Sequence, residues 1–172
     1  MEYRNINNEK VSLLGMGCMR LPLVEGTDEI DYEHTKKMVK YAIDNGITYF
    51  DTAYPYHNGK SELVIGKILK EYPRNSFKLA SKMPSWDLKT IDDAKRIFAE
   101  QLEKCQVEYF DFYLFHSVVE NNINEYLDTG KFITLGVRPE DIHYDEAFVA
   151  AHPETAIQAR IEVVEKLGAE TQ

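Results

Sequence analysis

The stretch Thr48-Tyr49-Phe50-Asp51-Thr52-Ala53-Tyr54-Pro55-Tyr56 is the most informative part of the sequence. Its first half, residues 48–53, is rich in β-branched and aromatic residues, which predicts a short strand. An amphipathic helix is predicted from Leu63 to Tyr72, opened by Ser61-Glu62 and stopped by Pro73. Its inward-facing residues are predicted to be Leu63, Ile65, Ile68 and Leu69. The chain therefore passes from a strand, through a loop of polar and aromatic side chains, into a helix.

The same alternation extends in both directions along the chain. Further strands are predicted over residues 11–19, 77–83 and 109–116. Further helices are predicted from Asp31 to Asn45-Gly46 and from Ile91 to Cys105, and a helical turn around residues 122–127. Four β-α units in succession predict a parallel sheet. The pattern alone leaves both a (β/α) barrel and a doubly wound sheet open.

Polar side chains of four kinds fall at the ends of the predicted strands. Asp51 ends the second strand, Lys82 lies near the end of the third, and His116 ends the fourth. Tyr56 lies in the loop directly after Asp51. Each alone has an ordinary explanation, such as a turn cap or a solvated lysine. Because the carboxyl ends of parallel strands share one edge of a sheet, together they indicate a functional site.

The stretches around these residues resemble the aldo-keto reductase family. In that family an Asp precedes the catalytic Tyr by five positions and Ser-Glu starts the next helix, as Asp51, Tyr56 and Ser61-Glu62 do here. The lysine and histidine strands of the family resemble Leu79-Ala80-Ser81-Lys82-Met83-Pro84 and Asp111-Phe112-Tyr113-Leu114-Phe115-His116-Ser117, and its first strand resembles Leu14-Gly15-Met16-Gly17-Cys18-Met19-Arg20. The resemblance covers about residues 1–133. It is greatest to the branch that often carries a C-terminal ferredoxin-type segment, whose cysteine cluster this sequence lacks, so no iron–sulfur cluster is expected.

The resemblance assigns a catalytic role to each of the four side chains. Reduction of a carbonyl by hydride builds negative charge on oxygen, so an acid must deliver a proton, and Tyr56 is the expected acid. A free phenol has a pKa of about 10, and a neighbouring ammonium lowers it by favouring the phenolate. Lys82 would supply that charge and Asp51 would hold Lys82 in place. His116 would orient the substrate carbonyl through a hydrogen bond.

The resemblance also implies NADPH or NADH as cofactor and a small carbonyl compound as substrate. The early cofactor contacts would come from Gly17, Cys18, Met19, Arg20 and Asp51. A complete eight-stranded barrel takes about 250 residues, whereas this chain has 172. We therefore expect an α/β fold, a truncated TIM-type half-barrel of about four β-α units, with weak or absent reductase activity because later cofactor-binding strands are missing. A catalytically silent chain is the alternative.

The C-terminal part has a different character. Strict alternation of apolar and polar residues over 156–164 predicts a half-buried strand. The stretches 135–142 and 163–171 resemble the C-terminal β domain of maltose-type sugar importer ATPases, which suggests a partner-binding role. No phosphate-binding loop of the Gly-x-x-x-x-Gly-Lys-Ser/Thr type occurs, so ATP hydrolysis is not expected. We predict two domains, 1–133 and a β-rich 134–172, joined near Lys131 to Thr134 as a natural or engineered chimera.

Composition narrows the classes of partner. A net charge of −9 argues against nucleic acid, and the longest apolar stretches are too short for a membrane helix. The N-terminus lacks the pattern of a signal peptide, and Cys18 and Cys105 form no metal-ligand spacing, so we expect a cytoplasmic protein without a metal. A half-barrel leaves two open sheet edges, which predicts that tail strands cover one edge or that two chains associate.

Overall fold

The structure is a computed structural model that describes residues 1–6 and 9–117. The chain divides into two compact units, Met1–Ser117 and Val118–Gln172. The predicted turn around 122–127, the junction near residues 131–134 and the predicted tail domain 134–172 all lie outside the described residues.

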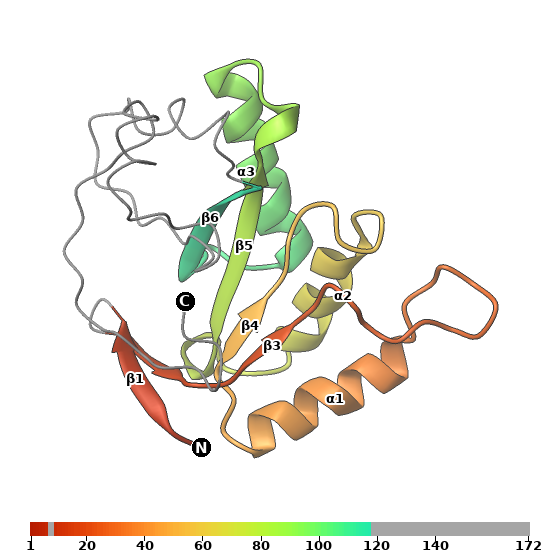
Figure 1. Ribbon diagram of the computed structural model, residues 1–172, viewed down its shortest axis with the longest axis vertical. Coiled ribbons are helices and arrows are strands. Elements are labelled where there is room, and N and C mark those ends of the chain that lie inside the picture. Colours follow the sequence, from red (N-terminus) through yellow and green to blue (C-terminus); the bar gives the residue numbers. More distant parts are fainter. Residues whose placement is uncertain (7–8, 118–172) are drawn as a thin grey trace, which may run out of the picture. The chain divides into compact units, whose positions relative to one another are not determined.

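Two sheets form the strand framework (Figure 1). An antiparallel hairpin at the N-terminus pairs β1 (Tyr3–Ile6) with β2 (Glu9–Ser12). The main sheet is parallel and its strands lie in chain order: β3 (Gly15–Gly17), β4 (Tyr49–Asp51), β5 (Lys78–Pro84) and β6 (Phe112–His116). Every crossover between neighbouring strands of this sheet contains a helix.

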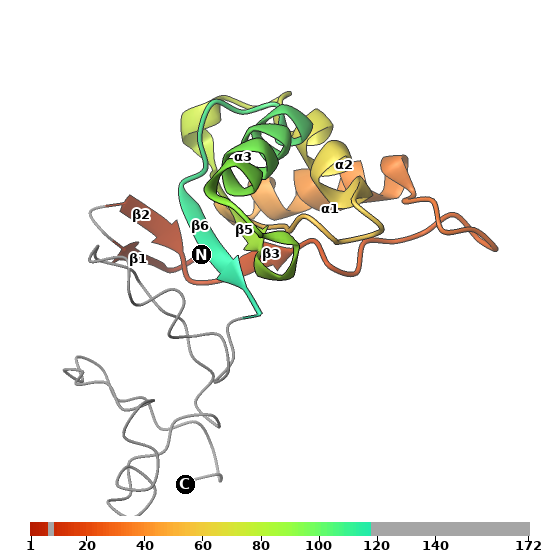
Figure 2. The ribbon, with the colours of Figure 1, turned by 90° about the horizontal axis from the view of Figure 1, so that it is seen from above.

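The three crossover helices lie on the same face of the parallel sheet (Figure 2). They are α1 (Tyr32–Asp44), α2 (Lys60–Leu69) and α3 (Ile91–Cys105), with single turns of 3₁₀ helix at Arg74–Ser76 and Ser85–Asp87. A doubly wound sheet has helices on both faces and a strand order that reverses. Neither feature occurs in the described residues, so the arrangement is that of a partial (β/α) barrel, as the resemblance to the aldo-keto reductase family implies.

The helix boundaries follow from local chemistry. The Asp31 side chain accepts a hydrogen bond from the His34 backbone N–H at 2.9 Å and caps α1, as expected. At the start of α3, Thr90 and Asp93 bond to each other's backbone in a capping box. α1 ends at Asp44, with Asn45 as its C-cap, and Gly46 follows with φ +85°, a conformation that glycine adopts without steric strain.

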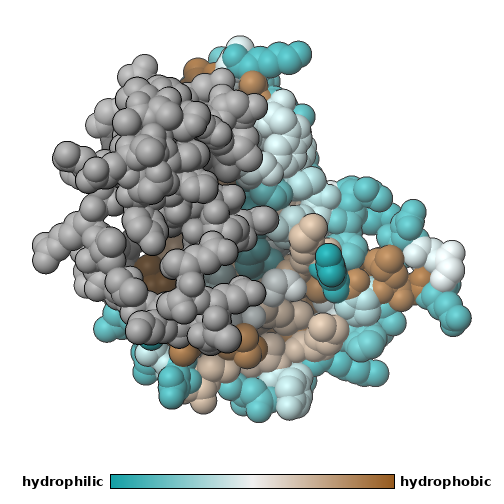
Figure 3. All heavy atoms as spheres, in the orientation of Figure 1, coloured by the Kyte–Doolittle hydropathy of each residue, from teal (hydrophilic) through white to brown (hydrophobic). Residues whose placement is uncertain are grey.

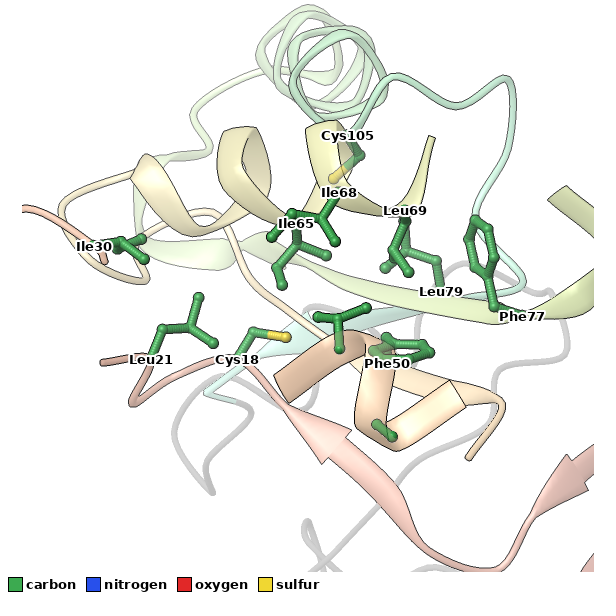
Figure 4. Packing of buried hydrophobic residues seen from close by; sticks show 12 residues of the cluster. Cys18, Leu21, Ile30, Phe50, Ile65, Ile68, Leu69, Phe77, Leu79 and Cys105 are labelled. Atoms are coloured by element: carbon green, nitrogen blue, oxygen red, sulfur yellow. The ribbon is translucent and has the colours of Figure 1, made fainter. Parts of the chain in front are cut away.

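The hydrophobic core lies between the sheet and its helices (Figure 4). Phe50 and Leu79 from the strands are fully buried against Ile65 and Ile68 of α2. Burying one such side chain stabilises the fold by roughly 1.5 to 3 kcal/mol before the entropy of ordering is counted. Cys18 and Cys105 are both reduced and buried in this core, which matches a packing role.

The structure corrects the first predicted strand. Residues 11–19 form two elements instead of one, because the chain bends at Leu13 and Leu14 and leaves the hairpin before β3 begins. Ser12 anchors the bend: its N–H donates to Thr48 Oγ1 at 3.0 Å, and its Oγ donates to Leu14 O at 2.7 Å. The sequence did not indicate this bend, because the apolar residues before Gly15 include no proline or glycine that would mark a turn.

Candidate active site

The carboxyl ends of the parallel strands bring the four predicted catalytic residues together. Asp51 is the last residue of β4, and His116 is the last residue of β6, opposite Pro84 of β5. Lys82 lies two residues before that strand end. Tyr56 lies in the turn between β4 and α2, where its N–H donates to Ala53 O at 3.1 Å.

Lys82 is the centre of the polar contacts at this edge. Its Nζ donates to Asp51 Oδ1 at 2.6 Å and to Thr52 O at 2.8 Å. The same Nζ lies 5.0 Å from the centre of the Tyr56 ring. Only 14% of the Lys82 side chain and 29% of the Asp51 side chain are exposed, so this ion pair is partly shielded from water. A cation in that place strengthens the local field at the phenol.

His116 stands on the other side of Tyr56. The two rings meet edge to face with centroids 5.8 Å apart, and Trp86 contacts the His116 ring at 5.3 Å. Burial lowers the pKa of His116, with a further contribution from the charge of Lys82. The imidazole is therefore neutral at pH 7. Among the described residues its buried Nδ1 has no hydrogen-bond partner.

The turn that carries Tyr56 is fixed on both sides. The Tyr54 hydroxyl donates to both carboxylate oxygens of Glu100 on α3 at 3.2 Å. His57 Nε2 accepts the Leu21 N–H at 2.9 Å, which joins the turn to the loop between β3 and α1. These contacts hold the phenol at the sheet edge.

The loop between β3 and α1 projects beside the site. An ion pair between Glu29 and Lys60, 2.5 Å long, adds a second connection between this loop and the start of α2. Leu23 and Val24 on the loop are 45% and 47% exposed. Figure 3 shows hydrophobic surface where Figure 1 draws this loop. Met19, at the beginning of the loop, is 60% exposed. This side of the site therefore offers apolar contacts.

The predicted cofactor-binding residues are divided between the core and the surface. Gly17 ends β3 with open space where a Cβ would stand, and Met19 and Arg20 are exposed. Cys18 differs: its side chain is fully buried, and burial raises the pKa of its thiol to about 12. Its N–H donates to Asp51 O at 2.8 Å. A ligand at this edge could meet only the main chain of Cys18.

Comparison with known proteins fits this geometry. A family model described as Aldo/keto reductase family matches residues 13–150. The chain belongs to the aldo/keto reductase family. It is 32% identical over 165 residues to "Probable aldo-keto reductase 1" of Glycine max, with 87% of this chain and 47% of that protein covered. The match to the family model continues past residue 133.

Solved structures show the same relationship. The thermostable aldo-keto reductase Tm1743, determined with the inhibitor epalrestat, is 30% identical with a TM-score of 0.62. The alignment covers 70% of this chain and 44% of that one. An aldo/keto reductase from Klebsiella pneumoniae in complex with NADP and acetate is 25% identical with a TM-score of 0.55, covering 63% of this chain and 36% of that one. The chain spans about half of the length of the curated relatives it matches.

These comparisons give no support to an importer-type tail or to a ferredoxin-type relationship, so both stay predictions. None of the helices in residues 1–6 and 9–117 has the length and apolar content needed to cross a bilayer.

Sequence reasoning overlooked several side chains near the site. Trp86 follows the lysine strand directly, and an exposed tryptophan beside a strand end was an available signal. His57, adjacent to Tyr56, was a second one. Gln101 had no such signal, because a glutamine on an amphipathic helix is usually exposed. In the structure it is completely buried.

Proposed function

We propose that this chain carries the catalytic centre of an NAD(P)H-dependent carbonyl reductase, with Tyr56 as proton donor. The observation that supports this most directly is the position of Lys82. Its Nζ is bound to Asp51 at 2.6 Å while lying 5.0 Å from the centre of the Tyr56 ring. A positive charge beside a phenol favours the phenolate that forms when the proton leaves.

The remaining groups have complementary roles in this proposal. Asp51 and the carbonyl of Thr52 hold the ammonium of Lys82, which has little freedom to turn away. Neutral His116 can donate a hydrogen bond to the oxygen of a substrate carbonyl, where negative charge develops. A nicotinamide, when bound, would supply the hydride to the carbonyl carbon. Tyr56 would deliver its proton to the carbonyl oxygen, which completes an alcohol.

The described residues fit a nicotinamide cofactor and an apolar substrate in part. The open space beside Gly17 leaves room for a ligand at the sheet edge. The main chain from Gly17 to Arg20 would hold one end of the cofactor. Exposed Met19 and Trp86 border the site, so we expect an aldehyde with an aromatic or aliphatic body to bind better than a small polar one.

We further propose that cofactor binding by this chain is weak. The described parallel sheet has four strands, half the number in a closed barrel. Positioning of two reactants supplies a large part of an enzyme's rate acceleration, so a loosely held cofactor lowers the rate strongly. A catalytically silent chain is the competing proposal. Titration with NADPH, followed by nicotinamide fluorescence, separates the two proposals. A dissociation constant of about 1 mM corresponds to a binding free energy near −4 kcal/mol. If no binding is seen even at about millimolar NADPH, the result favours the silent chain.

Turnover of an aromatic aldehyde by the full chain tests the role of Tyr56. Tyr56→Phe removes the proton donor and should lower kcat by about 10²-fold or more. Tyr41→Phe is the matched control, because Tyr41 lies on α1 and is 73% exposed. Equal activity of Tyr56→Phe and the wild-type chain would refute the assignment.

Association through the sheet edges is a separate proposal. Within the described residues, β3 and β6 each pair with only one neighbouring strand. An unpaired edge is usually covered or paired, so we propose that a second chain does this. The predicted covering of one edge by tail strands falls outside the described residues. Analytical ultracentrifugation distinguishes a dimer from a monomer. A partner-binding role for 134–172 and a cytoplasmic location stay predictions.

A further inference from the structure

A buried polar cluster lies between the sheet and two helices, within the otherwise apolar layer. It contains Glu62 of α2, Ser81 of β5 and Gln101 of α3, none of which is exposed to solvent. Ser81 Oγ donates to Glu62 Oε1 at 2.6 Å, and Gln101 Nε2 donates to the same oxygen at 2.7 Å. Buried polar groups are expensive unless they are bonded, so the cluster fixes its members firmly relative to one another.

The orientation of the Gln101 amide is set at both ends. Tyr113 of β6 donates its hydroxyl proton to Gln101 Oε1 at 2.5 Å. On the other side, Gln101 Nε2 approaches Glu62 Oε1, Ser81 Oγ at 2.9 Å and Lys82 O at 3.1 Å. The amide therefore faces the segment of β5 that contains the predicted catalytic lysine.

The carbonyl of Lys82 needs a donor from outside the sheet. Two residues earlier, Ala80 O accepts the Thr52 N–H at 2.9 Å on the side of β4. Carbonyl directions alternate along a strand, so Lys82 O points toward the same side. The pairing of β4 with β5 ends at Asp51 and Ala80, which leaves Lys82 O beyond the last strand partner. Gln101 supplies the missing hydrogen bond.

Ser81 and Lys82 present opposite faces of one strand. Ser81 points toward the helices, where it bonds Glu62, and Lys82 points toward the site, where it bonds Asp51. Contacts that fix the helix-facing side of Ser81-Lys82 therefore also fix the backbone position of Lys82, from which its side chain extends. We propose that Gln101 is a positioning residue that fixes the end of β5 and thereby holds Lys82 Nζ against Asp51 beside Tyr56. The part of this proposal that concerns catalysis rests on the proposed function. The part that concerns the placement of Lys82 does not depend on it.

Chemical labelling tests the placement without requiring turnover. The full chain is treated with limiting acetic anhydride, and acetylation of each lysine is followed by peptide mass spectrometry. Lys78 is an internal reference, because it lies on the same strand, is ion-paired with Glu9 and Asp111, and has a side chain 16% exposed against 14% for Lys82. The measured quantity is the rate at Lys82 divided by the rate at Lys78.

Gln101→Met keeps much of the side-chain volume and removes the amide. We expect the Lys82 to Lys78 ratio to rise about fivefold, the population change that loss of one net hydrogen bond produces. Ile97→Val is the control: it loosens the same helix at a buried apolar position that forms none of the cluster's hydrogen bonds, and its ratio should equal that of the wild type. An unchanged ratio in Gln101→Met, or an equal rise in Ile97→Val, would overturn the proposal.

A second variant covers failure of Gln101→Met to fold. Tyr113→Phe leaves the Gln101 side chain in place but frees its amide to rotate, so the ratio should rise by a smaller amount. No rise there would also overturn the proposal.

Kinetics then address catalysis separately. Where the wild-type chain turns over an aldehyde, Gln101→Met should lower kcat by roughly 10- to 100-fold with little change in KM, since Gln101 touches no substrate. A raised labelling ratio in a chain without turnover would support the positioning role and count against the reductase. An unchanged kcat would confine Gln101 to a structural role.

Discussion

Gly66 on α2 lies against the backbone of Cys105 at the end of α3, and Gly66→Ala should push the two helices apart. A Cβ built at Gly66 would lie 2.5 Å from the Cys105 carbonyl carbon and 2.6 Å from its Cα and O. Carbon atoms rest about 3.5 Å apart, so the helices must move by about 1 Å. Such overpacking costs about 1 to 3 kcal/mol, and alanine returns roughly 0.5 to 1 kcal/mol of helix propensity, giving a net loss of about 0.5 to 2 kcal/mol.

Urea denaturation of the full chain measures this loss. Gly66→Ala should lower the urea midpoint without changing the slope, because the surface exposed on unfolding stays the same. Gly17→Ala is the matched control, since a Cβ there meets no atom within 4 Å. The contact atoms of Cys105 are backbone atoms, so Cys105→Ala should not restore stability to the double variant. A Gly66→Ala chain as stable as the wild type would refute the close approach of the two helices.

Three further predictions concern buried charge. Because burial lowers the pKa of His116 from its ordinary value near 6.5, the unfolded chain gains this proton first, and stability should fall as the pH drops below about 6.5; His116→Gln should lack this component in pH-dependent urea titrations. Burial raises the pKa of Glu62 from 4.5, so here stability should decline as the pH rises from 4.5 through the raised value, and Glu62→Gln should abolish that decline in thermal unfolding followed by circular dichroism. Asp111 accepts hydrogen bonds from Arg74 at 2.6 Å and from the Leu79 N–H at 2.9 Å with a side chain 6% exposed, so Asp111→Asn should lower the free energy of unfolding by roughly 2 kcal/mol. An unaltered urea midpoint would contradict this last value.

Local signals allowed parts of the fold to be predicted closely. The helix from Ile91 to Cys105 has the predicted bounds, because Thr90 and Asp93 form a strong start signal and the apolar residues keep helical spacing. The grouping of Asp51, Lys82 and His116 was equally predictable, since parallel strands align their carboxyl ends. These features depend on residues that are close in sequence or on one rule of sheet topology.

Other features depend on contacts that no local pattern contains. Leu63 was predicted to face inward on α2, yet it is 49% exposed, because Glu62 takes the buried position through its bonds to Ser81 and Gln101. A polar residue can take this buried position in place of an apolar one only because three segments of the chain, α2, β5 and α3, meet there. Helical periodicity assigns a face to each residue but carries no information about a buried carboxyl satisfied from elsewhere.

The alternation of Ser81 and Lys82 along β5 has a consequence for how such a protein can evolve. Substitutions on the site-facing side of the strand can change the chemistry of the site while the core packing on the other side is unchanged. New activities can therefore evolve without loss of the fold. Gln101 weakens that independence at one point, because its amide donates a hydrogen bond to the backbone carbonyl of Lys82. A mutation at Gln101 would alter both properties at once, and a lineage that changed the lysine chemistry would have to tolerate or replace this glutamine as well.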